Sequence, residues 1–108
     1  MRAAYLPSNG RPMIVEIENR LDVLQRLVSG YIETDRLTPD LIAIINENGI
    51  ALGLPPNVNM VPKRWYLGNV VIVRAPYWAE DFSSLTDDDI KNLRKELQIK
   101  FGGDDDDA

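Results

Sequence analysis

Histidine and cysteine are both absent from this sequence, so any chemistry must use other residue types. Their absence excludes imidazole acid–base catalysis, thiol nucleophiles, Cys/His zinc sites and disulfides. The carboxylates of Glu80, Asp81 and Asp87–Asp89 remain as groups that could bind Mg²⁺. Asp87–Asp89 are better explained as the first turn of a helix, where acidic side chains favour the helix dipole. Glycine motifs for phosphate binding are also missing, and we expect no catalytic residue, no metal site and no cofactor.

The stretch between Glu47 and Glu80 contains basic and aromatic residues but no acidic residue. Positive charge beside aromatic rings suits phosphates and bases, because one supplies attraction and the other stacking. The candidate binding surface is therefore Lys63, Arg64, Trp65, Tyr66, Arg74, Tyr77 and Trp78. Three interpretations stay open: a protein-binding face, a site for a nucleotide or single-stranded nucleic acid, and core aromatic residues with basic neighbours by chance. Long duplex DNA is a poor match for an acidic chain.

The size and composition of the chain indicate one domain with its own core. It has 108 residues, of which 44% are hydrophobic. Its formal net charge is −5, but Asp104–Asp107 supply four of its seventeen acidic residues, and the other thirteen nearly balance twelve basic ones. We predict a single domain over residues 1–101 and a disordered acidic tail over residues 102–108. The alternative for the tail is an acidic interaction segment.

The first half of the sequence predicts two strands, a helix and two more strands. Residues 2–6 and 13–17 flank a loop rich in proline and glycine, which indicates a hairpin. A helix is predicted over 20–29. Charged residues in the β-prone run 31–37 indicate a strand that has one solvated face or lies near the edge of a sheet. The continuous apolar run 41–45 indicates a central strand.

The predicted helix over 20–29 has signals at both ends. Asn19 is a natural N-cap, and Gly30 can take the positive φ that often ends a helix. Its apolar residues recur at helical spacing and predict one buried face, made of Leu21, Leu24, Leu27 and Val28.

The second half of the sequence predicts a tight turn, two strands and a closing helix. Asn46–Gly49 contains Asn-Gly, a strong hairpin signal, so Ile50–Leu52 is expected to pair back on 41–45. Residues 58–67 show no regular pattern, and 70–73 reads as a second buried strand. Thr86 is the predicted N-cap of a helix over 87–100, whose buried stripe is Ile90, Leu93, Leu97 and Phe101.

These elements indicate an α+β fold. We predict a mostly antiparallel sheet of about five to six strands, with helices over about 20–29 and 87–100 packed on it, both on one face.

Four blocks of the sequence occur in a recognisable order. They are LVSGYIE (27–33), NENG with GLPPN (46–49 and 53–57), GNVVIV (68–73) and EDFSSLTD (80–87). This series resembles the bacterial and phage family called domain of unknown function 3846, over about residues 13–100. The resemblance implies a small single-domain protein, often encoded on phages, plasmids and conjugative elements, and so an accessory or counter-defence role. It implies no activity, catalytic residue or cofactor. Within these blocks, Asn46 and Asn57 are expected to satisfy backbone groups at chain corners.

Taken together, the residues favour binding over catalysis. We expect a small interaction module of a mobile element, with a protein partner and with edge strands such as 31–37 able to pair in a homo-oligomer. The alternative is a protein that binds a nucleotide or single-stranded nucleic acid through residues 63–78.

No stretch approaches the roughly 20 apolar residues of a membrane helix, and the N-terminus lacks the apolar core of a signal peptide. We therefore expect a cytoplasmic protein of a bacterial cell or phage-infected host, with no membrane association.

Overall fold

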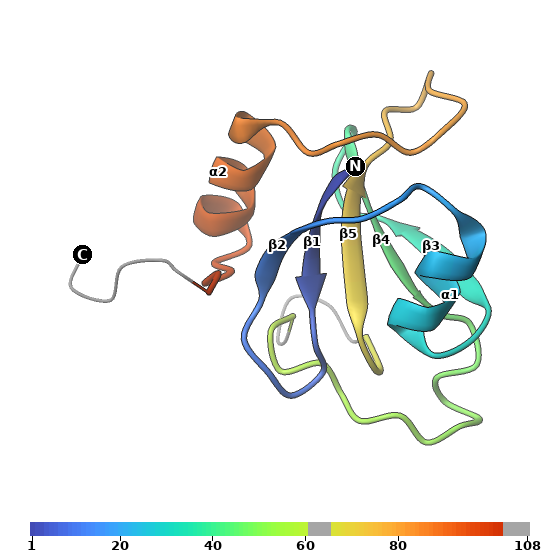
Figure 1. Ribbon diagram of the computed structural model, residues 1–108. Helices are drawn as coiled ribbons and strands as arrows, with labels where there is room; N and C mark the ends of the chain where they lie inside the picture. The colour runs from blue at the N-terminus through green and yellow to red at the C-terminus, as the bar shows by residue number, and fades with distance from the viewer. Residues whose placement is uncertain (61–65, 103–108) are drawn as a thin grey trace.

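Two apolar runs near the middle of the chain form inner strands of a five-stranded sheet (Figure 1). The computed structural model describes residues 1–60 and 66–102. Neighbouring strands are antiparallel, in the order β2-β1-β5-β4-β3, which confirms the predicted α+β class. The elements are β1 (Arg2–Leu6), β2 (Met13–Glu16), α1 (Leu21–Val28), β3 (Ile32–Arg36), β4 (Leu41–Asn46), β5 (Val70–Arg74) and α2 (Asp87–Glu96).

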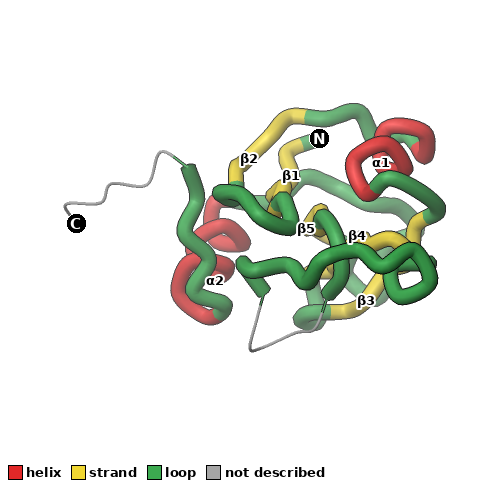
Figure 2. Tube along the Cα trace, turned by 90° about the horizontal axis from the view of Figure 1, so that it is seen from below, coloured by secondary structure: helices red, strands yellow, loops and turns green. Residues whose placement is uncertain are grey.

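The core consists of two layers, one on each side of the sheet. Side chains alternate along β5, so Val71 and Val73 pack with α1, whereas Val70 and Ile72 pack in the layer that contains α2. Figure 2 shows the two helices on opposite sides of the strands. The prediction that both helices cover one face is wrong. Because β4 and β5 are apolar on both faces, each face needs its own cover.

The predicted hairpin between 41–45 and Ile50–Leu52 is also wrong. Residues 47–53 form consecutive turns, with Leu52 N–H donating to Asn48 O at 2.9 Å. β4 already pairs with β3 on one side and with β5 on the other. A strand has only two sides that can form hydrogen-bonded ladders, so 50–52 has no place beside β4.

The ends of α1 differ from the prediction. Arg20, not Asn19, is the N-cap, and the Asn19 amide instead donates to Asp81 Oδ1 at 3.0 Å and Phe82 O at 3.2 Å. At the other end Ser29, not Gly30, takes the positive φ of 64°. The predicted apolar face is correct for its two buried residues, Leu24 and Val28, but Leu21 is exposed.

The predicted start of α2 is confirmed, but its predicted end is wrong. The Thr86 hydroxyl accepts from Asp89 N–H at 3.0 Å, and the Asp89 carboxylate accepts from Thr86 N–H at 2.9 Å, which completes a capping box. The helix ends at Glu96 rather than at 100. Gln98 has a φ of 57°, and the chain after it turns so that Ile99 and Phe101 enter the same core as the helix.

Two buried asparagines hold the loops at one end of the sheet, as predicted. Asn46 Nδ2 donates to Val28 O at 3.0 Å and Ser29 O at 3.2 Å, and its Oδ1 accepts from Asn48 N–H at 2.7 Å. Asn57 Nδ2 donates to Leu6 O and Gly68 O, both at 2.9 Å. Each amide satisfies backbone groups that would otherwise be buried without a partner.

The β1–β2 hairpin and the edge position of β3 are confirmed. The division into a domain over 1–101 and an acidic tail stays a prediction, since residues 103–108 lie outside the described part of the chain.

Glycine is required at position 30 because the Asn46 side chain lies close to its Cα, and not because of its φ angle. A Cβ there would lie 2.7 Å from Asn46 Nδ2, which is closer than real contacts allow. We predict that Gly30→Ala lowers the free energy of unfolding by about 1–3 kcal/mol, because the buried Asn46 amide must give up hydrogen bonds. Urea denaturation measures this change. Ser29→Gly is the matched control and is expected to stay within about 1 kcal/mol of the parent. A Gly30→Ala protein as stable as the parent would contradict the constraint.

Candidate interaction surface

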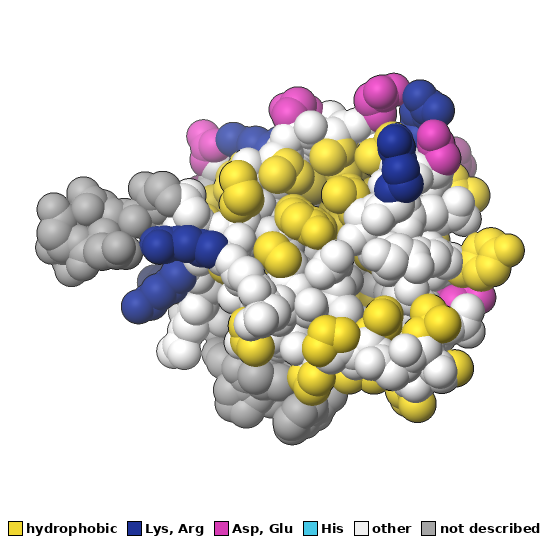
Figure 3. Space-filling view, turned by 60° about the horizontal axis from the view of Figure 1, so that its bottom comes forward, with side chains coloured by type: hydrophobic (Ala, Val, Ile, Leu, Met, Phe, Trp, Pro, Cys, Tyr) yellow, Lys and Arg dark blue, Asp and Glu magenta, His cyan; other side chains and the backbone are white. Residues whose placement is uncertain are grey.

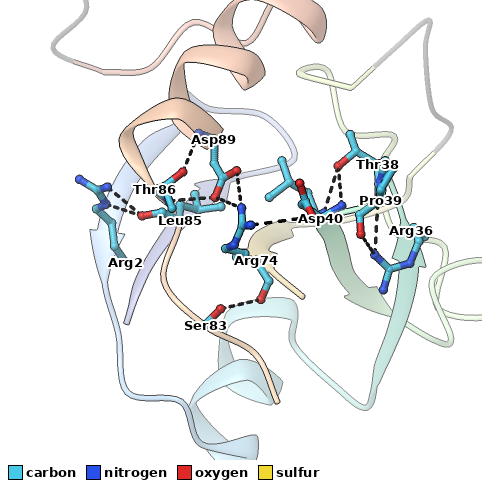
Figure 4. A network of polar contacts seen from close by, with 11 residues as sticks. Arg2, Arg36, Thr38, Pro39, Asp40, Arg74, Ser83, Leu85, Thr86 and Asp89 are labelled. Atoms are coloured by element: carbon cyan, nitrogen blue, oxygen red, sulfur yellow. Dashed lines mark hydrogen bonds and ion pairs between the residues drawn. The ribbon is translucent and has the colours of Figure 1, made fainter. Parts of the chain in front are cut away.

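Arg74 lies at the end of β5 and joins the sheet to the first turn of α2 (Figure 4). Its Nη1 donates to both carboxylate oxygens of Asp89, at 2.9 and 3.1 Å, and its Nη2 lies 3.8 Å from Asp40 Oδ1. Asp89 is buried and also completes the helix cap, so its charge is fully used inside the fold. Arg74, predicted as part of the binding surface, is therefore paired with acidic groups and supplies no free positive charge.

The chain between Arg74 and Ser83 forms a loop that is closed at its base, which we call the aromatic loop (residues 75–82). Arg74 N–H donates to Ser83 O at 3.1 Å, and Ser83 N–H donates back to Arg74 O at 2.8 Å. The two bonds from Asn19 to Asp81 and Phe82 tie the loop to the start of α1. In Figure 1 this loop stands clear of the sheet beyond the end of β5.

Arg36 at the end of β3 gives the aromatic loop a second support. Its guanidinium donates to the carbonyls of Thr38, Pro39 and Ala75 at 3.2, 3.0 and 2.8 Å. The same group lies 4.2 Å from the centre of the Tyr77 ring, within the range of a cation–π contact. Sequence reasoning missed Arg36 because it lies far from Tyr77 in the chain. Its only local signal was a basic residue at the end of a charged edge strand.

Tyr77 and Trp78 at the tip of the aromatic loop are 74% and 83% exposed. Large aromatic side chains at this level of exposure contribute little to a core, and the loop beneath them is well anchored. The structure thus brings together Tyr77, Trp78 and Arg36, of which two belong to the predicted surface.

The other predicted surface residues lie elsewhere. Tyr66 is buried in the α2-side core, and its hydroxyl donates to Asp35 on β3. The predictions for Lys63, Arg64 and Trp65 fall on residues outside the described part of the chain.

Three of the five acidic residues considered for Mg²⁺ form other contacts. Asp87 pairs with Arg2 at 3.0 Å, Asp89 pairs with Arg74, and Asp81 accepts from Asn19. Across residues 1–60 and 66–102, no group of three or more acidic side chains is placed to hold a metal ion.

A hollow of about 440 Å³ lies at the opposite end of the sheet from the aromatic loop. Its lining includes the apolar residues Ile45, Ile50 and Leu67 and the acidic residues Glu33 and Glu47. Ile50 is 86% exposed in the turn that follows β4. Figure 3, in which the lower end of Figure 1 comes forward, shows hydrophobic side chains spread over this face. The hollow combines apolar walls with negative charge.

Comparison with known proteins gives a family but no characterised relative. The family described as Domain of unknown function (DUF3846) has a model that matches residues 1–98 of the 108-residue chain. No curated protein and no solved structure matches the chain. Within the described residues, no helix is long and apolar enough to cross a membrane.

The pairing of Arg74 with Asp89 should stabilise the folded protein. We predict that Arg74→Ala lowers the free energy of unfolding by about 2–4 kcal/mol, because it leaves the buried Asp89 carboxylate without its partner. Chemical denaturation followed by circular dichroism measures the loss. Lys91→Ala, on the exposed side of α2, is the control and should change stability by less than about 0.5 kcal/mol. Equal effects of the two substitutions would show that the Arg74–Asp89 pair does not hold α2 to the sheet.

Proposed function

The chain belongs to the DUF3846 family, and we propose that it is a non-enzymatic interaction module that binds a protein partner through the aromatic loop. The observation that carries this proposal is the exposure of Tyr77 and Trp78 at the tip of a loop that is held from three sides. Tyrosine and tryptophan dominate binding hot spots, since each buries a large amphipathic ring at a small cost in side-chain entropy.

The anchoring of the loop supports binding for an energetic reason. A loop that must become ordered on binding loses conformational entropy, which reduces affinity. Here the Arg74–Ser83 bridge closes the base, Asn19 holds one flank, and Arg36 fixes the Tyr77 ring. The loop backbone and the Tyr77 ring are thus held in position before any partner arrives.

We place this module in the cytoplasm of a bacterial cell or phage-infected host, as an accessory protein of a mobile element. The support is the order of the four sequence blocks, which matches a family found on such elements. The genes on either side of this one test the placement. Phage, plasmid or conjugation genes are expected there, and a position inside a housekeeping operon would contradict it.

The alternative is a nucleotide or single-stranded nucleic acid that stacks on the same two rings. The exposed faces of Tyr77 and Trp78 support it, because stacking on aromatic side chains accepts any base. The charge of Arg74 does not, since Asp89 and Asp40 already pair with it. We therefore favour the protein partner.

Site-specific cross-linking tests the protein-binding proposal. A photoreactive phenylalanine analogue in place of Trp78 should give one discrete cross-linked product in cells of the natural host. The same analogue in place of Lys95, an exposed residue of α2, should not give that product. The product should also diminish at least about tenfold when Tyr77→Ala is added, because the variant removes a neighbouring hot-spot ring.

Identical products from positions 78 and 95 would contradict the proposal, as would the absence of any product at 78. Thermal denaturation of Tyr77→Ala and Trp78→Ala should show melting temperatures close to the parent, because both side chains are exposed. Loss of the product can then be assigned to the surface and not to unfolding.

A thermal-shift screen separates the nucleotide alternative. Mono-, di- and cyclic nucleotides at millimolar concentration should leave the melting temperature unchanged, because a ligand raises it only by binding the folded state. A rise in melting temperature that is lost in Trp78→Ala would favour nucleotide binding as the function of the aromatic loop.

A further inference from the structure

The outer edge of β3 presents backbone groups that no other strand of the described chain uses. In the ladder with β4, Tyr31 O accepts from Glu47 N–H at 3.0 Å, and Leu37 N–H donates to Leu41 O at 2.9 Å. Along an antiparallel strand, the backbone groups of successive residues point alternately to one side and the other. The odd-numbered residues of β3 therefore direct their N–H and C=O groups toward β4. The groups of Ile32, Thr34 and Arg36 therefore point away from the sheet. Among the described residues, none forms a hydrogen bond with these outward groups.

The opposite edge of the sheet, β2, is less open. Its ladder with β1 is four residues long, and Pro12, which precedes it, has no N–H to donate. The Pro12 carbonyl is already taken, because Gly102 N–H donates to it. Short length, proline and a crossing chain segment are the usual means of blocking an edge strand. β3 has five residues and none of these features within the described chain.

The side chains beside the β3 edge are acidic. Glu33 and Asp35 lie on its α2 side, and Glu47 lies next to Glu33 in the wall of the hollow. Within residues 1–60 and 66–102, neither Glu33 nor Glu47 forms an ion pair. The one basic residue of the strand, Arg36, is bonded to three carbonyls and to the Tyr77 ring.

These charges argue against a second copy of the chain as the occupant. Hydrogen bonds across two β3 edges join residues with outward groups, which are 32, 34 and 36. An antiparallel dimer that pairs two different residues of this set is centred on Glu33, Thr34 or Asp35. Centring on Thr34 places Glu33 opposite Asp35, and each other choice places an acid opposite itself. Like charges directly opposite one another destabilise a strand pair.

From the open edge, the acidic side chains and the adjacent apolar hollow, we infer that β3 accepts an extended basic peptide of another protein as a sixth strand. The backbone of the peptide bonds to Ile32, Thr34 and Arg36, as in other cases of strand addition. A lysine or arginine of the peptide lies opposite Glu33, and an aliphatic side chain on the same face enters the hollow beside Ile45 and Ile50. This surface shares one residue with the aromatic loop, Arg36, whose backbone faces the peptide and whose side chain contacts Tyr77. The variants below change Glu33 and Thr34 and leave Arg36 unchanged, so each proposal can fail without the other.

The test uses a fluorescent peptide of about nine residues in which every second position carries lysine or isoleucine in turn, with threonine between them, so that lysine and isoleucine share one face. Its binding to the full chain is followed by anisotropy at about 0.1 M salt. Saturable binding is expected. Two comparison peptides identify its cause: one carries N-methyl groups on the threonine amides, which are the ones that face β3, and the other has glutamate in place of lysine. Both should bind at least about tenfold more weakly, because one lacks ladder donors and the other repels Glu33.

Two protein variants complete the test. Glu33→Lys reverses the charge at an exposed position and should weaken binding about tenfold or more, whereas Glu80→Lys, with the same charge change on the aromatic loop, should alter it less than about twofold. Thr34→Pro removes one outward N–H without touching the β3–β4 ladder and should weaken binding as well.

Three results would overturn the inference. The first is no binding of the lysine peptide at saturating protein. The second is equal binding of the N-methylated peptide, which would indicate charge attraction alone. The third is a dimer of the parent chain that Thr34→Pro converts to a monomer, because the occupant of β3 would then be a second copy. Cross-links from position 78 are expected to be unaffected by Glu33→Lys, which keeps the aromatic-loop proposal independent.

Discussion

Burial of β4 and β5 on both faces is the constraint on which the rest of the structure depends. Ile42, Ile44, Val71 and Val73 face α1, while Leu41, Ala43, Val70 and Ile72 face the layer that contains α2. A sheet with two apolar faces must be covered twice. α1 covers one face, and α2 covers the other together with residues from the loops and the C-terminal segment, namely Met60, Tyr66, Leu85, Ile99 and Phe101. What remains accessible is the rim of the sheet, namely its two edge strands and the loops at its two ends. Both proposed interaction surfaces lie on that rim, one on a loop at the end of β5 and one along β3.

Buried polar side chains fix the positions of the loops and of α2 at the rim of the sheet. Among the described side chains, no buried polar atom lacks a hydrogen-bond partner. Asn46 and Asn57 fasten the loops at one end, and the Arg74–Asp89 pair fastens α2 at the other. Arg74 and Asp89 are used for position, whereas Glu33 and Glu47 form no ion pair with any residue of 1–60 and 66–102.

The sequence predicted those parts of the fold that local patterns decide. The continuous apolar runs became β4 and β5, and the Thr86 box began α2, because both signals act within a few residues. The errors came from competition between distant segments. Asn19 was a good local cap but bonds to Asp81 and Phe82 instead, and Ile50–Leu52 could not pair because β3 and β5 already flank β4. The candidate surface shows the same limit. The exposure of Tyr77 and Trp78, the pairing of Arg74 and the contact of Arg36 with Tyr77 all depend on which strands are neighbours.

Residue-resolved amide hydrogen exchange along β3 tests most directly whether the rim carries an open recognition edge. In the free protein, the amides of Ile32, Thr34 and Arg36 are predicted to exchange much faster than those of Glu33 and Asp35, because only the latter donate to β4. Adding the lysine–isoleucine peptide should slow the first three and leave the other two unchanged. Slow exchange of Thr34 in the free protein would show that the edge is already covered, and fast exchange of Thr34 with the peptide bound would show that no sixth strand forms. Either result would contradict the account.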